Sequence, residues 1–427
     1  MAPIAMYDTV VIYAELLPNI RQVSIAVSLP SPADASTSVQ TSANGDSILV
    51  THRGESKEAR LPGRVSAPSA LPIPGTPPSG STSLAWRLPV STSVTLPSTR
   101  DELQPTVPWS AQDLTPRSAI ACRQCGEAVV PEDRLDVWKD LPSENWAEMM
   151  DFWHCHKPHD HGQEKNGDDD DDDEHLTKRG YGANSSIAAQ TRVGFVDLTS
   201  FLLAEEDCTG LRFSTPDATS TRSTAAAALD ASPATQAPRM LHVTCASCAV
   251  HIGFYNTSIA SVVLFKWQTT CQTTATASAP STLAQSAPPT GADCLAATLL
   301  ATLSRSGSSK SVIVPTIQAP PNPKDDGGEQ QQPALHVWVL NSNITYASSL
   351  RPSAGPRSAL KLLYKPIPVE QADAMLESFA LDVQEVNFPV AVIAAAARGF
   401  EASALLLPAG ERLFNGWRVA LLDKWVS

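Results

Sequence analysis

The stretch SAIACRQCGEAVV, residues 118–130, carries a C-x-x-C pair followed by glycine, and a second pair lies in LHVTCASCAVHIGFY, residues 241–255. Two cysteines separated by two residues fit a tight turn whose amides point at sulfur, and two such turns complete a tetrahedral metal site. The pattern predicts a structural Zn²⁺ bound by Cys122, Cys125, Cys245 and Cys248. Four buried free cysteines and a redox C-x-x-C remain alternatives, although neither pair lies in a βαβ context.

The length and composition limit how many folded domains the chain can contain. The chain has 427 residues, enough for two or three cores. Segments dense in Pro, Ser and Thr bury too little apolar surface to fold and are expected to be disordered insertions or linkers: residues 67–99, 215–238, 269–289 and 315–333. We expect a β-rich N-terminal block at 1–115, a zinc-binding middle block at 116–270, a low-complexity linker at 271–334 and an α+β block at 335–427.

Extended segments rich in Val, Ile and Tyr outnumber helical ones, so we predict an α+β fold that is β-rich, with mainly antiparallel sheets and a few short helices. Residues 10–17 and 22–29 are expected to form two strands, 47–51 and 83–88 to add strands to the same sheet, and later segments to complete it. Further strands are expected at 335–340, 359–367 and 417–423, and helices at 369–380 and 390–398. Four aromatic residues are expected in the sheet core, with a ubiquitin-contacting surface as the alternative: Trp338, Tyr346, Phe414 and Trp417.

The charge distribution narrows the classes of partner. Net charge is −13, and the acidic run at residues 168–174 supplies seven of the negative charges without any matching basic stripe. We therefore expect no direct nucleic-acid partner. The chain has no run of 18 apolar residues and no basic, apolar leader in residues 1–13, so neither a membrane span nor a signal sequence is expected. Cysteines in C-x-x-C pairs favour a reducing compartment, cytoplasmic and/or nuclear.

A cysteine and several histidines crowd the end of LPSENWAEMMDFWHCHKPHD, residues 141–160. A proline near the start, an apolar stripe at i, i+3, i+4 and i+7, and a Lys-Pro pair near the end together predict a helix. His154, Cys155 and His156 then lie at its C-terminus, where imidazoles lower the pKa of a thiol or accept its proton. The alternative is a buried cysteine between solvated histidines.

Five segments together resemble the HECT-like ubiquitin ligase family, also called ubiquitin-conjugating enzyme E2-binding proteins: CRQCGE, LPSENWAEMMDFWHCHKP, TCASC, VWVLNSNITYASS and LFNGWRVALLD. The resemblance implies an intracellular ubiquitin-protein transferase. Such a protein binds a ubiquitin-conjugating enzyme and ubiquitin, and promotes ubiquitin transfer to protein substrates. The resemblance also implies a partner of the metallo-β-lactamase nuclease type that acts in pre-mRNA 3′-end processing.

The sequence departs from an ordinary HECT ligase, which carries its thioester cysteine near the C-terminus, because no cysteine follows Cys294. Carboxylates beside Cys208 disfavour its thiolate, and Cys271 and Cys294 lie in or beside an insertion. Cys155, flanked by His154 and His156, is the remaining catalytic candidate. The alternative function is a non-catalytic assembly factor whose Cys-His cluster occupies the nuclease metal site. An independent Cys-His hydrolase would lack an orienting residue.

Overall fold

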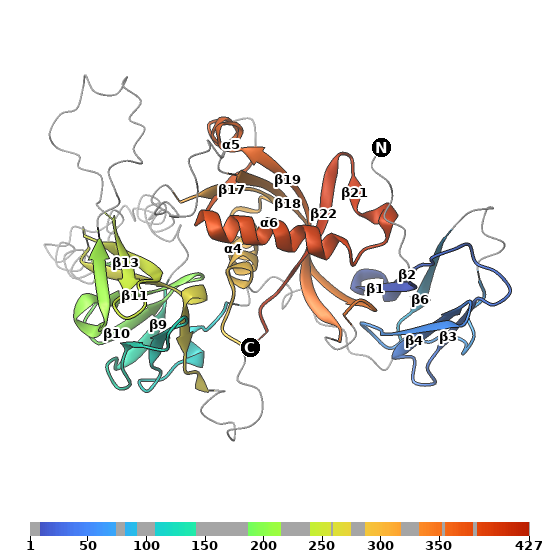
Figure 1. Cartoon of the computed structure of the whole chain (residues 1–427), viewed down its shortest axis with the longest axis horizontal. Helices are drawn as coiled ribbons and strands as arrows, with labels where there is room; N and C mark the ends of the chain where they lie inside the picture. The colour runs from blue at the N-terminus through green and yellow to red at the C-terminus, as the bar shows by residue number, and fades with distance from the viewer. Residues whose placement is uncertain are drawn as a thin grey trace, which may run out of the picture. The chain divides into compact units, whose positions relative to one another are not determined.

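The computed structural model describes residues 9–73, 82–91, 107–141, 187–214, 240–257, 259–274, 287–316, 333–351, 355–378 and 382–426 (Figure 1). The helix expected at residues 142–156, with His154, Cys155 and His156, lies outside these residues, as does the acidic run at 168–174. The chain divides into two compact units. The first contains Met1–Thr106, Gly291–Ile317 and Glu329–Val426, and the second is mainly Val107–Thr290.

The first unit is built on a sheet that combines N-terminal and C-terminal strands in the order β21-β22-β19-β18-β1-β2-β6, with β17 and β20 continuing from β18. The N-terminal and C-terminal strands meet where β1 pairs with β18. This pairing is antiparallel, with Glu15 of β1 opposite Tyr346 of β18. The strands are β1 Val11–Leu17, β2 Gln22–Ser28, β6 Ser83–Pro89, β17 Lys310–Pro315, β18 Pro333–Ser348, β19 Arg357–Pro368, β20 Gln384–Phe388, β21 Leu413–Phe414 and β22 Trp417–Asp423. The expectation that later segments complete the first sheet is therefore confirmed.

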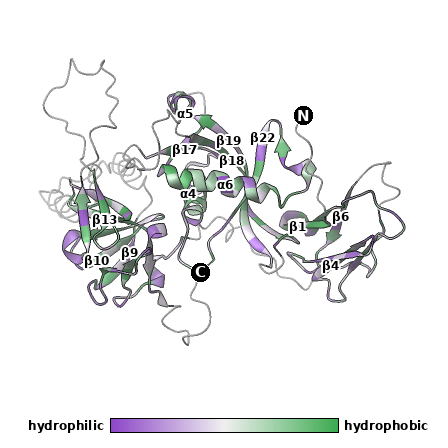
Figure 2. Ribbon diagram, in the orientation of Figure 1, coloured by the Kyte–Doolittle hydropathy of each residue, from purple (hydrophilic) through white to green (hydrophobic). Residues whose placement is uncertain are grey.

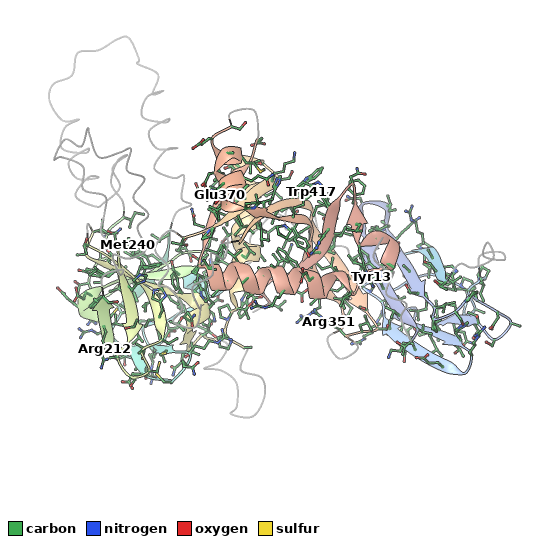
Figure 3. All side chains as sticks on the ribbon, turned by 45° about the horizontal axis from the view of Figure 1, so that its top comes forward. Tyr13, Arg212, Met240, Arg351, Glu370 and Trp417 are labelled. Carbon is green, nitrogen blue, oxygen red and sulfur yellow. The ribbon has the colours of Figure 1, made fainter. Side chains whose placement is uncertain are left out.

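A buried ion pair fixes this join between the two ends of the chain. Glu15 on β1 is 7% exposed, and its carboxylate accepts hydrogen bonds from the Tyr13 hydroxyl and from Lys361 on β19, each at 2.8 Å. Figure 3 labels Tyr13 on its strand. Because the carboxylate has two donors, its burial does not leave an uncompensated charge.

A second sheet in this unit corrects one expectation. Residues 47–51 do form a strand, but it belongs to a separate sheet of β3 Ser38–Thr41, β4 Ser47–His52 and β5 Glu55–Arg60. Its buried residues, among them Val39, Ile48 and Val50, share one core with Ile12 and Ile25 of the large sheet. Alternating burial shows that one face of a strand is covered, but it does not specify which strands pair with it.

Three α-helices occur in the described part of the chain: α4 Gly291–Ser306, α5 Val369–Leu376 and α6 Val390–Ala404. The two C-terminal helices confirm the sequence prediction. Helix α4 was not predicted. It lies, together with β17, inside residues 271–334, where a low-complexity linker was expected. Its side chains Leu295, Leu299 and Leu300 are at most 2% exposed. Threonines and serines among the leucines made this segment resemble a linker in the sequence. In the helix, the Thr298 hydroxyl donates to the Cys294 carbonyl one turn earlier. Figure 2 shows how apolar and polar residues mix along these helices.

The second unit contains two further sheets. Seven strands follow the order β12-β13-β14-β15-β11-β10-β9, and three follow the order β16-β7-β8. The seven are β9 Val137–Asp140, β10 Val193–Val196, β11 Ser200–Ala204, β12 Leu211–Ser214, β13 Met240–Cys245, β14 His251–Asn256 and β15 Ser261–Phe265. The three are β7 Ile120–Cys122, β8 Ala128–Val130 and β16 Thr269–Cys271. These hairpins present the ends of β7 and β13, where the two C-x-x-C pairs begin.

A fully buried lysine lies in the core of this unit. Lys266 begins a single 3-10 turn, Lys266–Gln268, and is 0% exposed. Its ammonium group donates to the carbonyl oxygens of Pro108 and Asp197, and lies 5.6 Å from the centre of the Phe201 ring. These contacts link three segments that are far apart in sequence, so the side chain acts as an internal cross-link.

The predicted fold class is confirmed: the described residues are β-rich, the sheets are mainly antiparallel, and helices are few. Parallel pairing is restricted to β9 with β10 and β17 with β20 among the described strands. Four other short 3-10 turns complete the described elements: Pro18–Ile20, Ala111–Asp113, Glu205–Asp207 and Ala409–Glu411. No helix in the described ranges is long and apolar enough to cross a membrane.

The four aromatic residues expected in the C-terminal core divide into two groups. Tyr346 is 2% exposed and stacks on Tyr13, so its core assignment is confirmed. Trp338 and Trp417 are only partly buried, packed against the edge of that core. Phe414 is 51% exposed, and its assignment to the core is wrong. It belongs to a two-residue strand at the edge of the sheet, which pairs with β22.

Candidate metal centre

The structure brings together the four cysteines that the sequence pairs predicted. Their sulfur atoms all lie within 4.8 Å of one another. Sγ of Cys122 is 3.7 Å from Sγ of Cys248, and Sγ of Cys125 is 3.6 Å from Sγ of Cys245. A disulfide would need a separation of about 2 Å. The spacing therefore describes four separate thiol ligands converging on one point, a set that could bind a metal ion.

The two turns that hold these sulfurs have the same backbone pattern. In the first, the Cys122 amide donates to the Glu127 carbonyl and the Gly126 amide donates to the Cys122 carbonyl. In the second, the Cys245 amide donates to the Val250 carbonyl and the Ala249 amide donates to the Cys245 carbonyl. Each turn is thus closed by a hydrogen bond from the residue after its second cysteine. The equivalence makes the two pairs matching halves of one site.

A left-handed residue ends each turn, and the sequence revealed only one of them. Gly126 has φ of +76°, a conformation that glycine adopts without strain. Ala249 occupies the equivalent place with φ of +59°, where a Cβ atom costs about 1–2 kcal/mol. Both C-x-x-C pairs predicted a turn, but the second pair has no glycine to mark its left-handed residue. This strained alanine indicates that contacts around the second turn hold it in the geometry that the cluster requires.

Neighbouring strands supply such contacts. The Ala246 amide donates to the Gly210 carbonyl at 2.8 Å, at the start of β12. The Thr209 amide donates to the Val129 carbonyl of β8 at 2.8 Å, which ties the same connection to the three-stranded sheet. The cysteine cluster therefore lies where two sheets of one unit are already linked by backbone hydrogen bonds.

The thiols of the cluster have unequal environments. Cys122 and Cys245 are buried, while Cys125 is exposed. Burial raises the pKa of the Cys122 thiol. Burial also opposes ionisation of Cys245, but the amides of Cys248 and Ser247 together with neighbouring thiols lower its pKa to about 7. Four thiolates this close repel one another, so their joint ionisation needs a central cation.

The other described cysteines are poorly suited to nucleophilic chemistry, which needs an accessible thiolate. Burial, followed by the charges of Asp207 and Glu205, raises the pKa of Cys208 to about 12. The sequence predicted from the neighbouring carboxylates that ionisation of Cys208 is disfavoured. The structure shows that burial is the larger cause of its raised pKa. Burial also raises the pKa of Cys271 to about 12, and Cys294 is 0% exposed in α4. The catalytic assignment of His154, Cys155 and His156 stays a prediction, because these residues lie outside the described ranges.

Two histidines lie close to the second turn without joining the cysteine cluster. His242 Nδ1 and His251 Nε2 are 3.2 Å apart across β13 and β14, and both rings contact Phe254. Burial and the neighbouring His242 lower the pKa of His251 to about 4. The imidazole of His251 is therefore neutral at pH 7 and packs as part of an aromatic core.

Comparison with known proteins assigns the chain to a family. A family model described as HECT-like ubiquitin-conjugating enzyme (E2)-binding matches residues 15–419. An uncharacterized protein of Saccharomyces cerevisiae is 42% identical over 52 residues, which are 12% of this chain and 15% of the yeast protein. An uncharacterized protein of Schizosaccharomyces pombe is 47% identical over 60 residues, 13% of this chain and 17% of that protein. The chain matches less than a fifth of either relative's length, whereas the family model spans both of its units. The chain therefore belongs to the HECT-like ubiquitin-conjugating enzyme (E2)-binding family.

Proposed function

We propose that this protein is a HECT-like E3 ubiquitin-protein ligase that binds a ubiquitin-conjugating enzyme and promotes ubiquitin transfer to protein substrates. The observation that carries the proposal is the family match over residues 15–419, which includes the four-cysteine cluster and most of both large sheets. The family description names the ubiquitin-conjugating enzyme as the expected partner. Ubiquitin and a protein substrate follow from the proposed reaction. The proposed compartment is the cytoplasm and/or the nucleus, where cysteines stay reduced.

The proposed transfer uses a thioester relay through Cys155. Its thiolate attacks the carbonyl carbon of the thioester that joins ubiquitin to the conjugating enzyme, and the enzyme's cysteine leaves as a thiolate. A substrate amine then attacks the new thioester and releases Cys155. His154 or His156 accepts the proton of the Cys155 thiol. The raised pKa values of Cys208 and Cys271 and the burial of Cys294 support this choice among the cysteines.

We also propose that the four-cysteine cluster binds Zn²⁺ in a structural role. Ligands about 2.3 Å from a tetrahedral zinc lie about 3.8 Å apart, close to the 3.6 and 3.7 Å separations between the two pairs. Four thiolates fill the coordination shell and leave no position for substrate or water. Cys122, Cys125, Cys245 and Cys248 would therefore hold the metal, and the ion would link the β7 and β13 turns rather than take part in transfer.

The first step of the proposed function predicts direct binding. Full-length protein titrated by calorimetry against a panel of ubiquitin-conjugating enzymes is expected to bind at least one of them saturably. The ubiquitin-charged form should bind more tightly, because the proposal gives ubiquitin contacts of its own. Conjugating enzymes for other ubiquitin-like modifiers serve as the control. Absence of heat with every ubiquitin-specific enzyme, using protein that melts cooperatively, would reject this function.

A further inference from the structure

One face of the large sheet carries a cluster of aromatic and basic side chains from five strands. Directly opposed residues of antiparallel strands project to the same side of a sheet. Lys310 lies opposite Trp338, and His336 lies opposite Lys365. Residues two apart on one strand also share a face, so His336 and Trp338 place both opposed pairs on the same side of the sheet. The set, here named the aromatic-lysine surface, is Lys310, His336, Trp338, Lys365, Phe414 and Trp417.

The side chains of this surface contact one another. The Trp417 ring meets His336 edge to face at 4.7 Å between centroids, and Trp338 at 6.2 Å. The Lys365 ammonium lies 4.6 Å from the centre of the Trp417 ring, and the Lys310 ammonium lies 5.1 Å from that of Trp338. Each tryptophan is therefore paired with a cation, which holds the rings in place without burying them completely.

Helix α5 covers the part of this sheet face next to the aromatic-lysine surface, whereas part of the surface itself is exposed. Val312 lies opposite His336 and packs in a core with Ala372 of α5, so this helix covers one end of the face. The opposite end exposes Phe414 at 51% beside Trp417. Figure 3 shows Trp417 on the strands, clear of α6. Aromatic residues that gather at an uncovered part of a sheet are typical of interaction sites.

The two lysines of this surface lack carboxylate partners within the part of the chain that the structure describes. Neither Lys310 nor Lys365 forms an ion pair with a described carboxylate, although the whole chain carries a net charge of −13. Nε2 of His336 is buried and has no hydrogen-bond partner among the described residues. The two lysines are partly exposed, so their ammonium groups remain able to pair with a carboxylate of a ligand.

We propose that the aromatic-lysine surface binds a short acidic segment of a partner protein, one that carries an apolar side chain among its carboxylates. The apolar side chain packs against Trp338, Trp417 and Phe414, and the carboxylates pair with Lys310 and Lys365. A single-stranded nucleic acid also combines negative charge with rings that stack. Two lysines neutralise few phosphates, however, and the acidic chain repels a polyanion, so the observations favour a protein segment. The proposal does not depend on ubiquitin transfer.

A titration followed by tryptophan fluorescence tests this proposal on the full chain. The probe is a synthetic peptide in which glutamates alternate with leucine and phenylalanine, and the comparison peptide has every glutamate replaced by glutamine. Saturable binding of the acidic peptide and weakening by salt are expected. The double variant Lys310→Gln/Lys365→Gln should weaken binding about tenfold. The matched control Lys57→Gln, on β5 of the same unit, should leave it unchanged.

The apolar half of the surface is tested separately. Phe414→Ala removes an exposed ring, so its melting temperature should match that of the wild type while peptide affinity falls. Equal affinity for the two peptides, or full affinity in the double lysine variant, would overturn the proposal. So would binding of oligo-deoxythymidine with no binding of the acidic peptide, since that result would make the surface a nucleic-acid site. The assay contains no ubiquitin-conjugating enzyme, so its outcome is independent of the proposed ligase function.

Discussion

If the cysteine cluster binds zinc as proposed, replacing Cys245 with serine is expected to abolish metal binding and lower the free energy of unfolding of the second unit by about 5 kcal/mol or more. Cys245 is fully buried at the end of β13, and its sulfur lies 3.6 Å from that of Cys125. A hydroxyl is a poor zinc ligand and would leave three thiolates without their charge balance. Since the proposed metal would connect two turns that are 120 or more residues apart in sequence, its binding energy would become folding energy.

Metal content and thermal unfolding measured on the same preparations provide the readout. Wild-type protein should carry one zinc per chain, and a chelator should reproduce the instability of Cys245→Ser. Ser247→Ala is the matched control, because this exposed residue lies in the same turn and supplies no ligand. Folded wild-type protein with almost no metal, or a Cys245→Ser variant that melts at the wild-type temperature, would refute the structural metal.

Replacing Lys266 with alanine is expected to cost about 3–5 kcal/mol of stability in the same unit. The change opens a cavity beside Phe201 and removes the donor for the carbonyl oxygens of Pro108 and Asp197. Lys266→Met keeps most of the volume and leaves the same carbonyls without this donor. Its smaller cost, about 1–3 kcal/mol, should measure the polar contribution alone.

Denaturant unfolding of the full chain checks this prediction. Lys139→Ala, at an exposed position on β9, is the control and should change stability by less than about 0.5 kcal/mol. If Lys266→Ala and Lys139→Ala unfolded at the same denaturant concentration, the ammonium group would not be a structural cross-link. Equal losses in the methionine and alanine variants would instead assign the whole effect to the carbonyl partners.

The cysteine cluster was predictable because its chemistry is local in sequence. Each C-x-x-C pair specifies a turn, and two turns need one another to complete a ligand set. The strands around Ile12, Ile25 and Leu362 were predictable for a similar reason, since buried β-strands concentrate branched apolar residues. In both cases a short window of sequence contained the information.

Features that depend on long-range pairing were not predictable in the same way. The strand at residues 47–51 could be recognised, but its sheet could not, because pairing is a property of two segments. Helix α4 was concealed by threonine, serine and alanine, which resemble a linker until Leu295 and Leu299 are seen to be buried. The exposure of Phe414 depends on its position at a sheet edge, which composition does not reveal.

The aromatic-lysine surface illustrates the same limit. Lys310 and Lys365 are separated by 55 positions, and nothing in either segment indicates that their side chains lie over tryptophans of neighbouring strands. The sequence suggested a sheet core for Trp417, and the structure shows it only partly buried beside that core. Identifying this surface therefore required the register of the antiparallel sheet rather than a motif.

Single-turnover discharge of a ubiquitin-conjugating enzyme charged with fluorescent ubiquitin tests the central claim most directly. With the full chain present, ubiquitin should leave the enzyme faster than it does alone, pass through a reducible adduct on this protein, and reach a substrate amine. Cys155→Ala should retain zinc, melting temperature and enzyme binding while forming no adduct. Discharge at the rate of the isolated conjugating enzyme, despite saturating binding, would contradict the ligase and leave a binding factor in its place.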